Sequence, residues 1–95
     1  MLLTWDPQKA LINIEKHGVS FETASHVFDD LYCCYIFDEL HSVDEERFNA
    51  IGKVDNILFV VFTERQDTMR LISARAATKK EEEMYYAQIQ NSLPR

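Results

Sequence analysis

The sequence predicts an α+β domain, an antiparallel sheet meander with helices packed against it, and three local patterns support this. Asp6-Pro7 is a typical helix start, in which the aspartate caps the helix and the proline takes its first position. Tyr32 begins a region rich in aromatic and β-favouring residues. Thr78 and Glu81 have the spacing of a capping box at the start of a further helix. The predicted order along the chain is β-α-α-β-β-β-β-α.

The N-terminal third is expected to hold one short strand and two helices. The strand is expected at 2–5, the first helix from Pro7 to about His17, where Gly18 ends it. The second helix, capped by Ser20, is expected over about 21–30. The apolar faces predicted for the two helices are Ala10, Leu11 and Ile14 for the first, and Ala24, Val27, Phe28 and Leu31 for the second.

The remainder is expected to form four antiparallel strands and a last helix. The strands are expected at Tyr32–Leu40, Glu45–Lys53, Ile57–Arg65 and Met69–Ala77, with turns at Asp55-Asn56 and within Gln66–Thr68. The last helix is expected to run from the Thr78 cap to about Asn91, with Pro94 beyond it.

Length and composition predict one globular domain over residues 1–95, because 46% of the residues are hydrophobic and 12% aromatic. Apolar runs stay well short of the roughly 20 residues that span a bilayer, and the N-terminus lacks a signal-peptide pattern. We therefore expect a cytoplasmic protein. Cys33 and Cys34 are adjacent and have no partner motif with zinc-ligand spacing, so we expect neither a metal nor a cofactor.

The net charge of the chain limits which partners it can bind. With 16 acidic and 10 basic side chains the formal net charge is -6, which argues against a broad nucleic-acid-binding surface. It is compatible with a small basic cleft and with a basic protein partner. The predicted strand Arg70–Arg75 carries two guanidinium groups, and arginine binds phosphate through a planar, permanently charged set of donors. This strand therefore indicates a local anion site.

Turn length decides which side chains share a face of the sheet. If Asp55-Asn56 is a two-residue turn, the opposed pairs are Glu46 with Arg65, Arg47 with Glu64, and Asn49 with Phe62. If the next loop is Asp67-Thr68 or Gln66–Met69, Arg65 lies opposite Arg70 and Val60 opposite Arg75.

This register places Arg65, Arg70 and Glu46 on one face, either as a solvated ion cluster or around an anion. Arg75 is expected on the other face with Ser73, Asn49 and Arg47, where a guanidinium must be paired or open to a cleft. Arg70 and Arg75 are five positions apart, so they can meet on one phosphate only through a bulge or at a sheet edge.

Lys16 and His17 form a second group with useful chemistry. Histidine titrates near neutral pH and can transfer protons, and lysine can hold a phosphate. The alternative is that both are last-turn cations that face the negative end of the helix dipole. His26 and His41 are expected to be surface groups.

Several blocks of the sequence together resemble the BrnT-type ribonuclease toxin family of type II toxin–antitoxin systems, over roughly residues 3 to 86. The two most specific blocks are Lys16-His17-Gly18-Val19-Ser20-Phe21 and Ile72-Ser73-Ala74-Arg75. The others are Trp5-Asp6-Pro7, Val27-Phe28-Asp29-Asp30, Glu46-Arg47-Phe48, Ile51-Gly52, Thr63-Glu64-Arg65 and the positions Asn13, Arg70, Ala77, Glu81 and Tyr85.

The resemblance implies a RelE-like fold and a metal-independent endoribonuclease that inhibits translation. It also implies a cognate antitoxin that binds DNA and neutralises the toxin in a hetero-oligomer. Operator DNA would then be contacted only through the antitoxin. Because the chain is acidic, an alternative is a catalytically weak or inactive member of the family that serves mainly as antitoxin partner and co-repressor.

The resemblance also implies the site residues. The catalytic candidates are Lys16, His17, Glu46, Arg47, Arg65 and Arg75, and the register adds Arg70, Ser73 and Asn49 as substrate-binding candidates. Arg65 and Arg75 would stabilise charge on the phosphate, and Glu46 or His17 would take the proton from the ribose 2′-hydroxyl. Lys16 would bind phosphate or assist the leaving oxygen.

Overall fold

The computed structural model describes residues 2–93, so the expected place of Pro94 lies outside the described residues. The elements are β1 (Leu2–Thr4), α1 (Pro7–His17), α2 (Phe21–Ala24), the 3-10 helix η1 (Ser25–Asp29), β2 (Cys34–Asp38), β3 (Arg47–Val54), β4 (Asn56–Arg65), β5 (Thr68–Ala76) and α3 (Lys79–Ser92). The sheet order is β1-β5-β4-β3-β2. The α+β class is confirmed, but the sheet is mixed because β1 runs parallel to β5. No helix among residues 2–93 is both long and apolar enough to cross a membrane.

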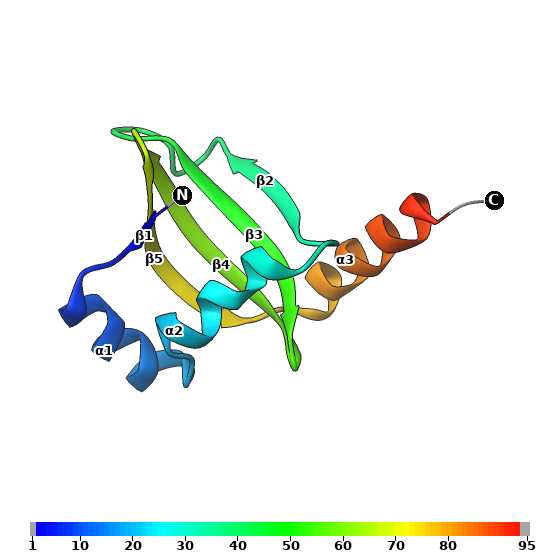
Figure 1. The fold of residues 1–95 in the computed structure, drawn as a ribbon, viewed down its shortest axis with the longest axis horizontal. Coiled ribbons are helices and arrows are strands. Elements are labelled where there is room, and N and C mark those ends of the chain that lie inside the picture. The colour runs from blue at the N-terminus through cyan, green and yellow to red at the C-terminus, as the bar shows by residue number, and fades with distance from the viewer. Residues whose placement is uncertain (1, 94–95) are drawn as a thin grey trace.

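The two faces of the sheet are covered differently (Figure 1). The first is covered by α1, α2 and η1, and the main core between them includes Phe21, Val27, Val60 and Phe62. The second is covered only toward one end, where Tyr85 of α3 packs over a smaller buried cluster. The helix coverage therefore leaves part of the second face open for a functional site.

Helix boundaries follow the capping signals in the sequence. Asp6 Oδ1 accepts a hydrogen bond from the backbone N–H of Gln8 at 2.8 Å. Thr78 and Glu81 form both hydrogen bonds of the capping box. Gly18 ends α1 in the left-handed conformation, with φ of 68°, which costs glycine little.

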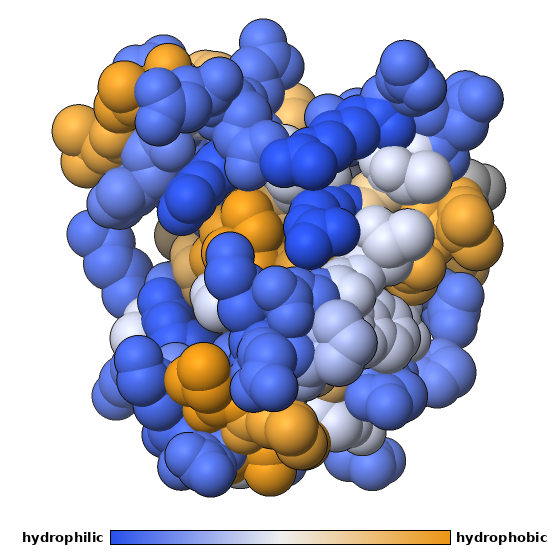
Figure 2. Space-filling model, turned by 90° about the vertical axis from the view of Figure 1, so that its left-hand side faces the viewer, coloured by the Kyte–Doolittle hydropathy of each residue, from blue (hydrophilic) through white to orange (hydrophobic). Residues whose placement is uncertain are grey.

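The buried face predicted for the first helix is correct only at Ala10, which packs against the main core. Leu11 is 60% exposed and Ile14 45% exposed, and Figure 2 shows hydrophobic residues at the surface low on the face it displays, where α1 lies. The residue of α1 that is buried is Asn13. Its amide bonds the edge of β5, so a polar side chain occupies the position of α1 that faces this edge.

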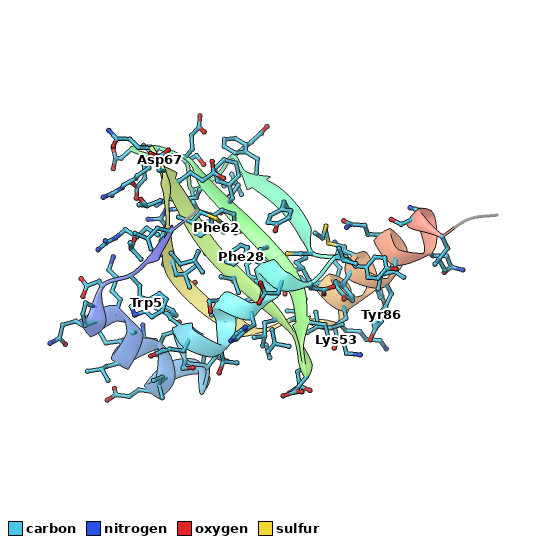
Figure 3. All side chains as sticks on the ribbon, in the orientation of Figure 1. Trp5, Phe28, Lys53, Phe62, Asp67 and Tyr86 are labelled. Carbon is cyan, nitrogen blue, oxygen red and sulfur yellow. The ribbon has the colours of Figure 1, made fainter. Side chains whose placement is uncertain are left out.

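The second predicted helix is shorter than expected, because α2 gives way to η1 after one turn. Ala24 and Val27 are fully buried as predicted, but Leu31 is 93% exposed. Phe28 packs edge-on against Phe62 with ring centroids 5.3 Å apart (Figure 3). The η1 segment lies so close to β3 that a Cβ on Gly52 would come within 2.8 Å of the Val27 Cβ.

The predicted register between β3 and β4 is wrong by one residue. Asp55 alone makes the turn, with φ of 59°, and Val54 pairs with Asn56. The opposed pairs are therefore Arg47 with Thr63 and Asn49 with Val61, in place of Glu46–Arg65, Arg47–Glu64 and Asn49–Phe62.

The predicted register between β4 and β5 is also wrong. Arg65 pairs with Thr68 rather than Arg70, and Arg75 pairs with Phe59 rather than Val60. Between these pairs Phe62 opposes Leu71 while Val61 opposes Ser73, so Ile72 is an extra residue in β5. This bulge restores Arg70 and Arg75 to the same face, because their partners Thr63 and Phe59 are four residues apart on β4.

Asp30 joins η1 to α3 and to β3. Its carboxylate accepts hydrogen bonds from the Tyr85 hydroxyl at 2.5 Å and from the Lys53 and Tyr32 backbone N–H groups, both at 2.9 Å. Burial raises the pKa of this carboxyl, but these three hydrogen bonds outweigh it, so the pKa lies below its ordinary value of 3.8.

This shift predicts how stability depends on pH. A carboxyl whose pKa is lower in the folded than in the unfolded chain contributes stability that is complete above the unfolded value and is lost as pH falls through the folded value. The free energy of unfolding of the wild type should therefore exceed that of Asp30→Asn at neutral pH, and the difference should shrink as pH falls below about 3.8. Urea unfolding of both proteins from pH 7 to pH 3 measures it. A difference that does not change over this range would contradict the assignment.

Candidate active site on the open face of the sheet

A cleft of about 440 Å³ lies on the second face, and we name it the arginine cleft. Four predicted site residues meet there, from β3 and from β5: Arg47, Asn49, Ser73 and Arg75. The remaining lining residues are Asp38, His41, Phe59, Val61 and Ile72. The strand pairing explains the grouping, because Asn49, Val61 and Ser73 lie side by side across three strands.

Arg75 is held in place at one wall of this cleft. Its Nη1 and Nη2 donate to Glu81 Oε1 and Oε2 at 2.8 and 3.0 Å, and its guanidinium lies 4.2 Å from the centre of the Phe59 ring. Burial raises the pKa of Glu81, but the Arg75 and Thr78 hydrogen bonds outweigh it and lower this pKa. The Arg75 side chain is still 35% exposed, so it is both paired and open to the cleft.

A smaller cleft of about 140 Å³, the helix cleft, contains Lys16 and His17. It shares Ile72 and Ser73 with the arginine cleft, so the end of α1 borders the arginine cleft.

Asn13 fixes this end of α1 and was not among the predicted site residues. Its Nδ2 donates to the carbonyl oxygens of Ala74 at 2.8 Å and Val19 at 2.9 Å, and its Oδ1 accepts from the Ala74 N–H at 3.0 Å. The sequence signals were its place among the positions that carry the family resemblance and its position one turn before Lys16 and His17.

A third cleft of about 540 Å³, the loop cleft, lies on the other side of Arg47 and is also lined by Arg65. Arg65 Nη2 donates to Glu45 Oε2 at 2.8 Å. This hydrogen bond is the main cause of the lowered pKa of Glu45, to which the nearby charges of Arg47 and Arg70 also contribute. The expected counter-charge, Glu46, is therefore replaced by its neighbour Glu45.

Two predicted residues lie apart from these clefts. Glu46 is exposed and lines none of the three, and its backbone carbonyl accepts a hydrogen bond from Thr63 Oγ1 at 2.7 Å. Arg70 is half-buried on the second face of the sheet, the face of Arg75, and also lines none of the three clefts.

His41 was expected to be a plain surface group, but it lines both the arginine cleft and the loop cleft. Its Nδ1 lies 2.8 Å from Asp38 Oδ2, and its backbone N–H donates to Asp38 Oδ1 at 3.2 Å. Burial opposes ionisation of Asp38, but the hydrogen bonds from His41 outweigh it and lower the pKa of that carboxyl. The signal in the sequence was the three-residue spacing of Asp38 and His41 at the end of a strand.

The fold and the site define a class of protein: a small α+β domain with a cleft suited to binding and cleaving a nucleic-acid backbone. Arginine, amide and hydroxyl groups of the sheet, with Lys16 and His17 at the end of α1 and His41 in the loop between β2 and β3, line these clefts and suit the binding of a phosphate backbone and the transfer of protons. Among residues 2–93, His, Cys, Asp and Glu side chains form no group of three or more that could hold a metal ion.

Comparison with known families places the chain within this class. Residues 5–81 match the family described as "Ribonuclease toxin, BrnT, of type II toxin-antitoxin system". The chain belongs to this family, as its sequence blocks predicted. No curated protein matches the chain.

Proposed function

We propose that this protein is the ribonuclease toxin of a type II toxin–antitoxin pair and that it cuts RNA in the arginine cleft without a metal. The observation that carries the proposal is the meeting of Arg47, Asn49, Ser73 and Arg75 in one cleft of a chain that belongs to a ribonuclease toxin family.

The clefts offer the groups that phosphodiester cleavage needs. Arg47 and Arg75 would hold the non-bridging oxygens, where negative charge grows in the transition state. Lys16 and His17, beside Ser73, would bind an adjacent phosphate or assist the leaving oxygen. The buried Oδ1 of Asn49 has no hydrogen-bond partner among the described residues. A ribose hydroxyl or a base amino group would satisfy it once the side chain turned toward the cleft.

The family also supports a protein partner, which we propose to be a DNA-binding antitoxin that neutralises the toxin. The net charge of -6 is complementary to a basic, DNA-binding protein. An apolar groove of about 410 Å³, lined by Phe28, Tyr35, Phe48, Phe62, Glu64 and Met69, offers a contact surface on the face opposite the clefts. Inhibition of translation, operator binding through the antitoxin, a RelE-like fold and a cytoplasmic location belong to the same proposal.

A second candidate function is that of a catalytically weak antitoxin partner and co-repressor. One observation favours it: Arg65 and Arg75 are already bonded to Glu45 and Glu81, which neutralises part of the positive charge that RNA would meet.

Induction in a bacterial host separates the two functions. The toxin reading predicts that the wild type stops growth and cuts cellular RNA, that the double variant Arg65→Ala, Arg75→Ala does neither, and that the product of the neighbouring gene restores growth. If induction is harmless and the purified protein leaves RNA intact with and without ribosomes, the toxin reading is wrong. Tight association with the neighbouring gene product would then favour the second function.

A further inference from the structure

The loop that joins β2 to β3 is built to hold one imidazole at the cleft. Asp38 ends β2 directly opposite Arg47, which begins β3. Ser42 Oγ donates to the Asp38 carbonyl and accepts from the Arg47 N–H at 2.9 Å. Together with the two hydrogen bonds between Asp38 and His41, these contacts tie His41 to the strand ends that carry Arg47.

The hydrogen bond to Asp38 fixes how the His41 ring is used. An ionised carboxylate can only accept, so His41 Nδ1 carries a proton in this contact, and in the neutral ring the lone pair is therefore on Nε2. The Asp38 side chain is 17% exposed, whereas that of His41 is 66% exposed. The carboxylate is sheltered and the imidazole is presented outward, which is the arrangement by which a carboxylate orients a histidine that accepts a proton.

The other two histidines lack one of these features. His17 lines the helix cleft but has no hydrogen-bonded carboxylate among the described contacts. His26 has a carboxylate at the same spacing, with Nδ1 3.1 Å from Asp29 Oδ2, but it lies on η1 and lines none of the three clefts. His41 combines an orienting carboxylate with a place beside the arginines.

We propose that His41 is the general base of RNA cleavage in the arginine cleft and that Asp38 is the residue that positions it. This inference rests on the proposed function. It replaces Glu46 and His17 as acceptors of the 2′-hydroxyl proton. The 2′-oxygen transfers its proton to His41 Nε2 and forms a bond to phosphorus, while the bond from phosphorus to the 5′-oxygen breaks. The 5′-oxygen takes a proton from water, and the hydroxide that remains removes the proton from His41, so Nε2 is free again. The products are a 2′,3′-cyclic phosphate and a 5′-hydroxyl, with Arg47 and Arg75 holding the non-bridging oxygens.

Kinetics with a fluorescently labelled single-stranded RNA, either free or on translating ribosomes, test this assignment. His41→Ala should lower kcat by about 100- to 10,000-fold, the usual contribution of a general base, and leave KM within about threefold. Asp38→Asn should also lower kcat, by up to about 10,000-fold, because asparagine can hold His41 in the wrong tautomer. The matched control His26→Ala should cleave as the wild type does.

Two further measurements distinguish a proton acceptor from a merely structural residue. Added imidazole should restore part of the activity of His41→Gly. The acidic limb of the wild-type pH–kcat profile should be lost in His41→Ala, although this variant retains the other titratable and charged groups that face the three clefts. These are Lys9, Lys16, His17, Asp38, Asp44, Glu45, Arg47, Arg65 and Arg75.

The outcomes separate this inference from the proposed function. If the wild type cleaves RNA and His41→Ala cleaves at a similar rate, or if imidazole gives no rescue, His41 is not the base, although the protein is still a ribonuclease. If the wild type cleaves nothing, the proposed function is wrong and the inference is wrong with it.

Discussion

Arg75→Ala is expected to slow RNA cleavage by about 100- to 1,000-fold, the usual cost of removing a group that stabilises transition-state charge. Arg75 is both paired with Glu81 and open to the arginine cleft, so a purely structural role must be tested against a functional one. Substitution of Glu81, which forms the ion pair with Arg75, provides this test. Glu81→Gln removes the ion pair but keeps a side-chain oxygen for the capping box, which tolerates glutamine.

The two variants therefore give opposite results under the two interpretations. If Arg75 serves RNA, Glu81→Gln keeps or increases the cleavage rate while Arg75→Ala loses it. If the ion pair only braces α3 against β5, both variants lose activity and stability together. Initial cleavage rates, with circular dichroism and urea unfolding of each variant, distinguish these cases. Equal activity in Arg75→Ala and the wild type would show that Arg75 takes no part in RNA cleavage.

Asn13→Ala is expected to lower the free energy of unfolding by about 3 kcal/mol, because each buried polar group left without its partner costs about 1–3 kcal/mol. The Asn13 side chain bonds both backbone groups of Ala74 and the carbonyl of Val19, and it is only 4% exposed. Asn13→Asp should destabilise at least as much, because a carboxylate cannot donate to the two carbonyl oxygens. Asn91→Ala, an exposed amide near the end of α3, is the matched control.

Urea unfolding midpoints of these variants measure the effect. The same loss should loosen the end of α1 that carries Lys16 and His17 next to Ser73. A decrease below about 0.5 kcal/mol in Asn13→Ala, the range typical of surface substitutions, would show that the amide pairing at the β5 edge contributes little.

The sequence predicted those features that depend on local chemistry. The caps at Asp6, Ser20 and Thr78 act within one turn of helix, so the starts of all three α-helices could be located from the sequence. The α+β class followed from two of these caps, at Asp6 and Thr78, together with the β-favouring region that begins at Tyr32. The grouping of Arg75 with Ser73, Asn49 and Arg47 was also predicted and holds in the arginine cleft.

The strand register and the sheet face on which each side chain lies could not be predicted, because each depends on a single residue in a turn or a bulge. A one-residue turn at Asp55 shifted the β3–β4 pairing, and the extra residue Ile72 changed the face of Arg70 relative to Arg75. The exposure of Leu11 and Ile14 was not predicted, because apolar periodicity does not reveal that Asn13 replaces a strand neighbour at the β5 edge. His41 was missed because the function of the Asp38–His41 pair depends on where the loop places it.

The central claim is that RNA binds the open sheet face at the arginine cleft. Its most direct test is an NMR titration of the ¹⁵N-labelled protein with a short RNA whose ribose carries 2′-O-methyl groups, which binds but cannot be cleaved. The claim predicts that the amide signals of Arg47, Asn49, Ser73 and Arg75 shift together, while those of Phe28 and Tyr35, which line the apolar groove on the opposite face, stay in place. Shifts confined to the apolar groove, or an absence of shifts under conditions in which unmodified RNA is cleaved, would contradict it.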